Sequence, residues 1–152
     1  MGEFPENGPV LVLAGDTPLL KPETLRRLLD THGDALCTVL TAHVEDAGAY
    51  GRIVRRPDGS VARIVEAANA TAEELAIDEI NTGVYCFDAA WLRDVALPGL
   101  KPNPPKDEYY LTDVIAAAAE RGTDALRALV HTDASETMGV NDRWALSKAE
   151  AI

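Results

Sequence analysis

The sequence predicts an α/β fold with a mixed, mainly parallel β-sheet. Short apolar segments alternate along the chain with segments whose leucines or alanines recur at helical spacing, which is typical of a sheet covered by helices. Two alternating segments flank Pro57-Asp58-Gly59, a strong turn signal, and predict one β-hairpin within that sheet. The chain has 152 residues, the length of one ordinary domain, so we expect a single domain.

Glycine, proline and leucine mark the first elements. Residues 10–14 are apolar and are followed by a glycine, which predicts a buried strand. Pro22 then opens a helix that extends to His32, with three leucines at the spacing of one helix face and Gly33 as its stop. A second apolar strand is expected over residues 36–44, and the hairpin follows it.

Helical and strand-like segments continue to alternate after the hairpin. Trp91 and Leu92 are expected to pack a short helix against the sheet, and Gly122 is expected to end an alanine-rich helix. Residues 97–108 hold four prolines and are expected to form an ordered surface loop. The remaining expected elements are a helix over residues 71–76, a strand over 79–87, a helix over 89–95, a helix over 110–121, a strand over 125–131 and a last helix over 142–152.

The composition restricts the classes of partner. The 25 acidic residues exceed the 14 basic ones and give a net charge of −11, so nucleic acid is excluded as a main partner. No run of about 18 apolar residues occurs and the segment MGEFPENG lacks the features of a signal peptide, so we expect a soluble, cytoplasmic protein with no membrane partner. Cys37 and Cys86 lie in apolar segments without metal-ligand spacing, so we expect reduced core thiols rather than a zinc site or a disulfide.

A carboxylate follows directly after the first predicted strand. Gly15 interrupts the apolar run and Asp16 stands at its exit, where open α/β sheets place their ligands. Asp16 could hold a metal ion, accept a hydrogen bond from a substrate, or cap the turn that follows. The strand alone does not distinguish these roles.

A second candidate carboxylate lies at the open end of the hairpin. If Asp58 and Gly59 form a two-residue loop, Gly51 lies opposite Glu66, whereas a three-residue loop would shift this pairing by one position. Glu66 would then face a residue without a side chain. A solvated acid at a strand end is the alternative for Glu66, and a bulge or bend is the alternative for Gly51.

Further polar candidates stand at the starts of later elements. Asn81 lies just before a buried-looking segment and could bond sugar hydroxyls or form a strand-entry turn. Tyr110 and Thr112 open the alanine-rich helix, where a half-buried tyrosine and a helix cap are the alternative roles. Asn141 stands at the start of the last helix and, taken alone, is its N-cap.

Five motifs occur in an order that resembles the uridyltransferase domain of the bacterial bifunctional enzyme that makes UDP-N-acetylglucosamine. The resemblance extends from about residue 9 to residue 151. The motifs are VLAGDTPLL, AYGRIVRRPDGSVARIVE, EINTGVYCFD, DEYYLTDVIAAA and GVNDRW.

This resemblance implies a Rossmann-like nucleotidyltransferase fold and a reaction that joins UTP to N-acetylglucosamine 1-phosphate with release of pyrophosphate. It implies that Asp16 and Asn141 hold a catalytic Mg²⁺, a cation that typically takes one or two protein oxygens. The ligands that it implies are N-acetylglucosamine 1-phosphate and UDP-N-acetylglucosamine, a peptidoglycan precursor for cell wall biogenesis. The substrate-binding residues that it implies are Gly15, Asp16, Gly51, Glu66, Asn81, Tyr110, Thr112 and Asn141.

The sequence also departs from the family pattern. It contains no glycine-rich loop of the GxGTRM kind and no β-helix domain for acetyl transfer, so residues 1–152 are expected to form an N-terminally truncated, sugar-phosphate-binding portion of the domain. Ala68 and Asn69 replace a lysine and an aspartate of the family. Ala14 replaces a tyrosine or small polar residue before Gly-Asp.

Three functions are compatible with these observations. The first is part of a nucleotidyltransferase that is weak or inactive alone, because donors aimed at the departing pyrophosphate are missing. The second is a sugar-phosphate or metal binding module without transfer chemistry, and the third is a half-enzyme that another chain completes. An uncovered strand edge also predicts self-association or a covering partner chain.

Overall fold

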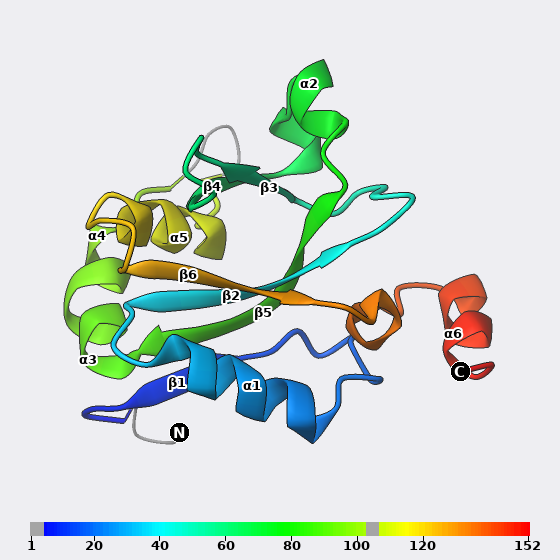
Figure 1. Cartoon of the computed structure of the whole chain (residues 1–152), viewed down its shortest axis with the longest axis horizontal. Helices are drawn as coiled ribbons and strands as arrows, with labels where there is room; N and C mark the ends of the chain where they lie inside the picture. The colour runs from blue at the N-terminus through cyan, green and yellow to red at the C-terminus, as the bar shows by residue number, and fades with distance from the viewer. Residues whose placement is uncertain (1–4, 103–106) are drawn as a thin grey trace.

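The computed structural model describes residues 5–102 and 107–152. It shows a six-stranded sheet with helices on both faces, so the predicted mixed α/β fold is confirmed (Figure 1). The strands are β1 (Pro9–Val12), β2 (Cys37–His43), β3 (Arg52–Arg55), β4 (Val61–Val65), β5 (Glu79–Asp88) and β6 (Leu126–His131). The α-helices are α1 (Pro22–His32), α2 (Ala72–Leu75), α3 (Ala89–Trp91), α4 (Leu97–Gly99), α5 (Leu111–Ala119) and α6 (Arg143–Ala149). Two 3₁₀-helical turns lie at Ala67–Asn69 and Ala134–Thr137, and a π-helical turn lies at Leu92–Ala96.

Strand β5 lies inside the sheet and pairs with three strands. β2 pairs with one edge of β5, while β1 and β3 pair with its other edge, and all three pairs are antiparallel. β3 and β4 form an antiparallel hairpin, and β2 and β6 form a parallel pair. The prediction of a mainly parallel sheet is therefore wrong, because most of the paired strands are antiparallel. β1 and β2 run in the same direction, but β5 lies between them, and apolar segments do not reveal strand order.

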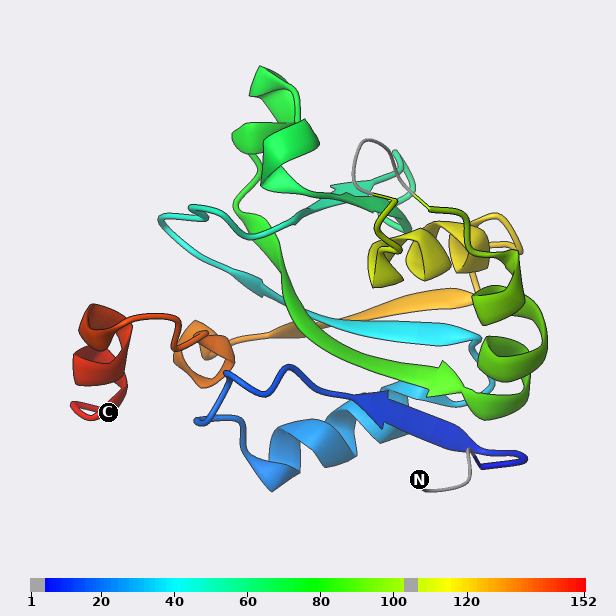
Figure 2. The same ribbon diagram turned by 180° about the vertical axis from the view of Figure 1, so that it is seen from behind.

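A gap along one edge of β5 positions the site. β1 pairs with β5 from Tyr85 to Asp88, whereas β3 reaches β5 at Ile80 (Figure 2). Within the described residues, no strand pairs with residues 82–84 on this edge. Gly83 has a φ of +78°, a conformation that favours glycine, so the backbone of β5 is irregular inside the gap.

Apolar side chains cover both faces of the sheet. On one face, α1 packs Leu28 against Val84 and Cys86 of β5. On the other face, Tyr85 and Phe87 of β5 pack with side chains from α3, α5 and the hairpin. This alternation along β5 is expected of a strand that is buried on both faces.

Both cysteines lie in this core as free thiols. Burial raises the pKa of Cys37 well above its usual value and that of Cys86 to about 11. The predicted place of both cysteines in the core is confirmed.

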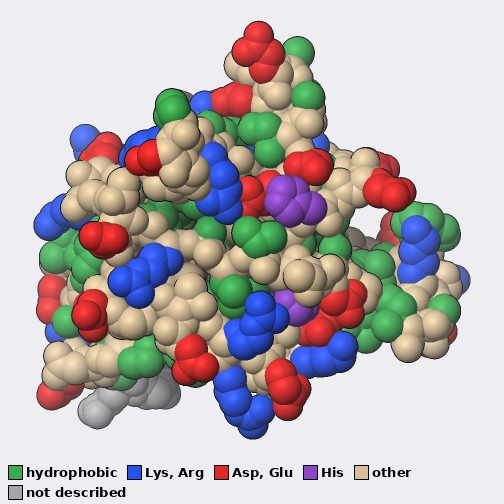
Figure 3. All heavy atoms as spheres, in the orientation of Figure 1, with side chains coloured by type: hydrophobic (Ala, Val, Ile, Leu, Met, Phe, Trp, Pro, Cys, Tyr) green, Lys and Arg blue, Asp and Glu red, His purple; other side chains and the backbone are tan. Residues whose placement is uncertain are grey.

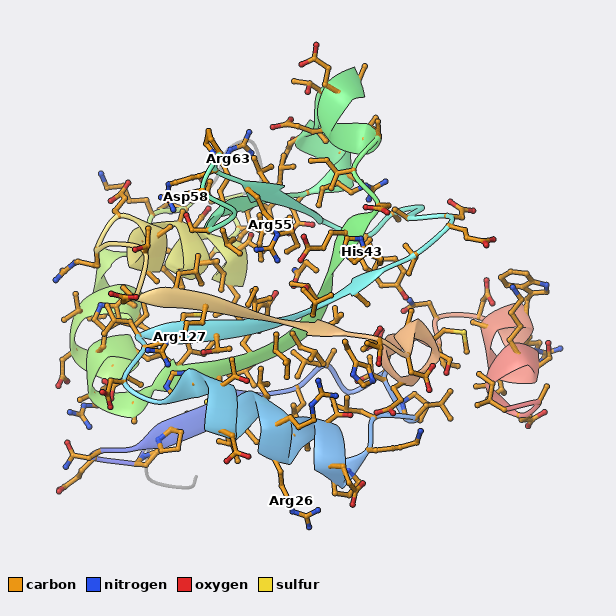
Figure 4. The ribbon with its side chains drawn as sticks, in the orientation of Figure 1. Arg26, His43, Arg55, Asp58, Arg63 and Arg127 are labelled. Atoms are coloured by element: carbon orange, nitrogen blue, oxygen red, sulfur yellow. The ribbon has the colours of Figure 1, made fainter. Side chains whose placement is uncertain are left out.

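The β3–β4 hairpin reaches the predicted register through two irregularities that cancel. The Arg56 amide donates to the Ser60 carbonyl at 2.8 Å, so the loop has three residues rather than two; Asp58 lies in this turn in Figure 4. A bulge farther along the hairpin shifts the pairing back by one position, so Arg52 lies opposite Val65. Gly51 and Glu66 flank this pair, so they keep the predicted arrangement, in which one lies opposite the other.

One predicted helix is divided. The segment at residues 89–95 forms α3 and then a π-helical turn over Leu92–Ala96, which leads into α4. Trp91 and Leu92 are buried, as predicted. The proline-rich loop predicted over residues 97–108 begins within α4, and its middle part, 103–106, lies outside the described residues.

The last helix, α6, lies apart from the sheet and buries none of its residues (Figures 1 and 2).

Acidic and basic side chains are intermixed on the face drawn in Figure 3 rather than gathered into one basic surface. Among the described residues, every helix is too short or too polar to cross a bilayer.

The packing of α1 can be tested at Leu28, which is fully buried. We expect Leu28→Ala to lower the free energy of unfolding by about 3 kcal/mol, because it leaves a cavity between α1 and β5. Leu75 on α2 is 44% exposed, so Leu75→Ala is the control and should change the same quantity by less than about 0.5 kcal/mol. Urea denaturation measures both values, and equal losses would contradict the described packing of α1.

Candidate functional site

A pocket of about 240 Å³ lies in the gap between β1 and β3. The predicted residues that line it come from the loop after β1, the hairpin, β5 and the loop before α6; they are Asp16, Gly51, Glu66, Asn81 and Asn141. Its other lining residues, which the sequence analysis did not assign to the site, are Ala14, Thr17, Ala49, Tyr50, Thr82, Gly83 and Gly139.

A second pocket, of about 260 Å³, lies beside α5. Its lining includes Trp91, Leu100 and Val114 and contains none of the residues predicted for the site. We therefore place the candidate site in the polar pocket between β1 and β3.

The loops that hold Asp16 and Asn141 meet at one wall of the pocket. The Val140 amide donates a 2.8 Å hydrogen bond to the Asp16 carbonyl. A β-carbon on Gly139 would lie 3.5 Å from Asp16 Oδ2 and 3.3 Å from Asn141 Nδ2, so both side chains approach one point. Within the described residues, no hydrogen bond or ion pair engages either side chain. The two residues that the resemblance assigns to one Mg²⁺ therefore lie close together, and the Asp16 carboxylate does not cap the turn that follows it.

Asn141 does not cap the last helix. The N-cap of α6 is Asp142, whose carboxylate accepts a 2.7 Å hydrogen bond from the Ala145 amide. The interpretation of Asn141 as an N-cap is therefore wrong, and its side-chain amide lies at the pocket instead.

The opposite wall is built around Gly51. A β-carbon there would lie 3.1 Å from Ile64 Cγ2 and 3.4 Å from the Val65 carbonyl oxygen, which is closer than a larger residue tolerates without a shift of its neighbours. The Gly51 carbonyl accepts a 2.8 Å hydrogen bond from the Asn81 amide. The Asn81 side chain in turn donates to the Tyr85 hydroxyl at 2.8 Å, which fixes its orientation.

The charge of Glu66 acts on this wall. Burial, opposed by the hydrogen bond from Asn81 and aided by the negative charge of Glu66, raises the pKa of Tyr85 to about 12. The Tyr85 hydroxyl therefore stays protonated at neutral pH. Glu66 is half-buried, and within the described residues no hydrogen bond or ion pair engages its carboxylate, so its oxygens are available to a ligand.

Three predicted residues do not line the pocket. Gly15 is exposed in the turn that leads to the site aspartate. Tyr110 occupies the N-cap position of α5, and Thr112 lies in the first turn, so Thr112 does not cap this helix. The Tyr110 hydroxyl donates to Glu108 at 3.3 Å. Burial and the negative charges of Glu108 and Glu66 raise the pKa of Tyr110.

Tyr50 and Gly139 are pocket residues that sequence reasoning missed. Tyr50 Oη accepts a 3.0 Å hydrogen bond from the Gly139 amide, and its ring packs beside Ile80. The sequence could have indicated both residues, because Tyr50 precedes the predicted site residue Gly51 and Gly139 lies two residues before Asn141. The hydrogen bond ties the hairpin side of the pocket to the wall that holds Asn141.

A buried carboxylate fixes the same two loops outside the pocket. Glu136 is 5% exposed and accepts hydrogen bonds from Thr24 Oγ1 at 2.7 Å and the Lys21 amide at 3.3 Å. It also forms a 2.9 Å ion pair with Lys21 Nζ. Burial alone would raise the pKa of Glu136, but these bonds and the nearby His131 lower it to about 2. The ionised carboxylate therefore joins the start of α1 to the Ala134–Thr137 turn.

The family model for nucleotidyl transferases matches residues 2–136. The chain belongs to this family. The chain is 48% identical over 96% of its length to the bifunctional protein GlmU of Shouchella clausii and 52% identical over 95% of its length to that of Exiguobacterium sibiricum. It covers 32% of each relative, so the chain spans about a third of the length of the curated relatives it matches. The predicted resemblance is confirmed.

A solved structure has a similar fold. A protein from Bacillus anthracis, assigned as a glucose-1-phosphate thymidylyltransferase and solved with a sucrose, matches with a TM-score of 0.64 and 18% identity. The match covers 97% of this chain and 55% of that one. The predicted Rossmann-like nucleotidyltransferase fold is confirmed.

The role of Glu136 in joining the two loops predicts a pH dependence. Its pKa of about 2 in the folded state lies below the usual 4.5, so its contribution to stability is present above pH 4.5 and is lost as the pH falls toward 2. We expect Glu136→Gln to lower the free energy of unfolding by at most about 3 kcal/mol at pH 6.

Urea denaturation between pH 6 and pH 2.5 measures this difference. The gap between wild type and Glu136→Gln should narrow steadily below pH 4.5. A gap that stays constant over this range would show that the charge of Glu136 does not support the loops.

Proposed function

We propose that this chain is the sugar-phosphate-binding part of an N-acetylglucosamine-1-phosphate uridyltransferase, which joins UTP to N-acetylglucosamine 1-phosphate and releases pyrophosphate. The observation that supports this most is the single pocket in which Asp16 and Asn141 face Gly51, Glu66 and Asn81. The same residues lie in the motifs that resemble the uridyltransferase domain. Similarity to GlmU proteins further supports a role in making UDP-N-acetylglucosamine for the cell wall.

The hairpin side of the pocket has the chemistry to bind an amino sugar. The free carboxylate of Glu66 would accept hydrogen bonds from sugar hydroxyls. The bare backbone at Gly51 lets an acetamido group approach closely. Asn81, oriented by the Tyr85 hydroxyl, adds polar side-chain atoms at a fixed place.

The opposite side of the pocket fits a divalent cation. Asp16 Oδ2 and the side-chain amide of Asn141 approach one point. A carboxylate with an amide oxygen is a donor set that Mg²⁺ accepts, and the Asn141 amide would present its oxygen here once it is turned to exchange Oδ1 with Nδ2. The Asp16 carboxylate has no protein partner within the described residues that a cation would need to displace. When bound, Mg²⁺ supplies positive charge that offsets the negative charge of reacting phosphates. Asp16 and Asn141 would hold it beside the phosphate of the bound sugar.

Binding without turnover is the alternative for this chain acting alone. The 152 residues contain no GxGTRM-type loop, whose backbone donors would meet the β- and γ-phosphates of UTP. A sugar-phosphate-binding module, or one half of an enzyme whose donors come from another chain, therefore stays the second candidate. An assay of pyrophosphate release from UTP and N-acetylglucosamine 1-phosphate distinguishes the two candidates. Release by the chain alone would favour the uridyltransferase, and binding without release would favour the second candidate.

Glu66 provides a test of the sugar pocket. Titration with UDP-N-acetylglucosamine should shift the NMR signals of Gly51, Glu66 and Asn81. Glu66→Gln should weaken binding about tenfold or more, because a charged acceptor of sugar hydroxyls is lost. Glu73→Gln, an exposed change on α2, is the control and should leave the affinity unchanged. Shifts confined to the apolar pocket beside α5 would contradict this site.

Asp16 provides a test of the cation site. Mn²⁺, a paramagnetic substitute for Mg²⁺, should broaden the NMR signals of Asp16, Gly139 and Asn141 selectively. Asp16→Asn should weaken Mn²⁺ binding by about tenfold or more, since the only charged ligand is removed. Asp34→Asn, at an exposed position after α1, is the control. Equal broadening in wild type and Asp16→Asn would count against the metal assignment.

A further inference from the structure

Arg52 is a buried cation without an acidic partner. It is 3% exposed, and within the described residues no carboxylate forms an ion pair with it. The buried acids Glu79 and Glu136 differ from Arg52 in having a partner of opposite charge. Glu79 forms an ion pair with Arg55, and Glu136 forms one with Lys21. A buried charge without an opposite charge is unfavourable unless oriented dipoles compensate it.

Backbone carbonyls of one loop provide this compensation. The guanidinium of Arg52, at the start of β3, donates to the carbonyl oxygens of Ala47 at 3.2 Å and Gly48 at 3.1 Å, and to that of Tyr50. Three carbonyl oxygens within four residues therefore converge on one planar cation. Because a guanidinium presents its donors in a rigid fork, these bonds fix the path of the 47–50 loop.

The loop held in this way reaches the candidate site. Tyr50 accepts the 3.0 Å hydrogen bond from the Gly139 amide, and the next residue, Gly51, accepts the 2.8 Å hydrogen bond from the Asn81 amide. Arg52 itself does not line the site; it lines a separate cavity of about 290 Å³. Its effect on the site must pass through the loop.

We infer that Arg52 is a positioning residue, which holds the 47–50 loop so that Tyr50 and Gly51 stand at fixed places on the wall of the pocket. The expected effect on substrate binding rests on the proposed function. If the pocket binds the sugar, a loosened loop would weaken that binding without removing a contact between Arg52 and the ligand. Lysine cannot replace Arg52, since one ammonium group does not reproduce the planar fork.

The test compares Arg52→Lys with Arg56→Lys in the full chain. Arg56 is the matched control, because its guanidinium also donates to backbone carbonyls, those of Val61 and Ala119, but not to residues of the pocket. The first measurement needs no ligand: amide hydrogen exchange at Tyr50 and Gly139, both of which donate hydrogen bonds within this network. The second is the dissociation constant for UDP-N-acetylglucosamine.

In Arg52→Lys, we expect the Tyr50 and Gly139 amides to exchange about tenfold faster or more, and sugar-nucleotide binding to weaken by a similar factor. Arg56→Lys should match wild type in both. Wild-type exchange rates at Tyr50 and Gly139 in Arg52→Lys would overturn the positioning role. Unchanged affinity in Arg52→Lys, with binding by wild type, would overturn it as well. If wild type binds no sugar nucleotide, the proposed function fails, and the exchange rates alone determine whether Arg52 positions the loop.

A second variant keeps the inference testable if Arg52→Lys does not fold. Tyr50→Phe removes the hydroxyl that joins the loop to Gly139 but leaves the guanidinium bonds in place. It should speed exchange at Gly139 about tenfold while the amide of residue 50 stays protected by its bond to Ala47. Unchanged exchange at Gly139 would overturn the route from Arg52 to the pocket.

Discussion

The pocket depends on the hydrogen bond from the Val140 amide to the Asp16 carbonyl, 2.8 Å long, which joins two loops that are far apart in the sequence. Neither loop is part of a strand or a long helix, so neither has a ladder of hydrogen bonds to hold it. The buried Glu136 carboxylate supplies a second connection between the same loops. Glu136 lies in the segment before Asn141 and accepts hydrogen bonds from the segment after Asp16. A low-dielectric environment strengthens such a charged connection, provided that its partners stay in place.

The sheet provides the space that these loops enclose. β1 and β3 pair with the same edge of β5 but at different ends, and the pocket lies in the interval between them. Irregular backbone at Gly83 and the absence of a side chain at Gly51 keep this interval open. Most residues that line the pocket therefore come from loops, while β5 contributes Asn81, Thr82 and Gly83 and connects the two walls. The bond between Tyr50 and Gly139 connects one wall to the other.

Sequence periodicity predicted the elements of this fold better than their arrangement. Alternating segments located the hairpin and a buried-looking segment located β5, but neither pattern reveals that β5 lies antiparallel between β1 and β2. The hairpin register was predicted correctly although the assumed loop was too short, because a bulge restored the pairing. Asn141 and Asp142 have similar capping chemistry, so only the structure shows which one caps α6. Arg52 and Glu136 escaped notice because most of their partners are backbone atoms or residues distant in the chain. The pairing of Asp16 with Asn141 came from the family motifs, not from periodicity.

We propose that one pocket holds an amino-sugar phosphate on its hairpin side and a divalent cation on its other side. A crystal structure of the chain grown with UDP-N-acetylglucosamine and Mn²⁺, recorded with anomalous scattering, tests this claim most directly. We expect the Mn²⁺ peak beside the side-chain oxygens of Asp16 and Asn141, and the acetamido sugar between Gly51, Glu66 and Asn81. A sugar bound elsewhere, or an Mn²⁺ peak away from Asp16 and Asn141, would contradict it.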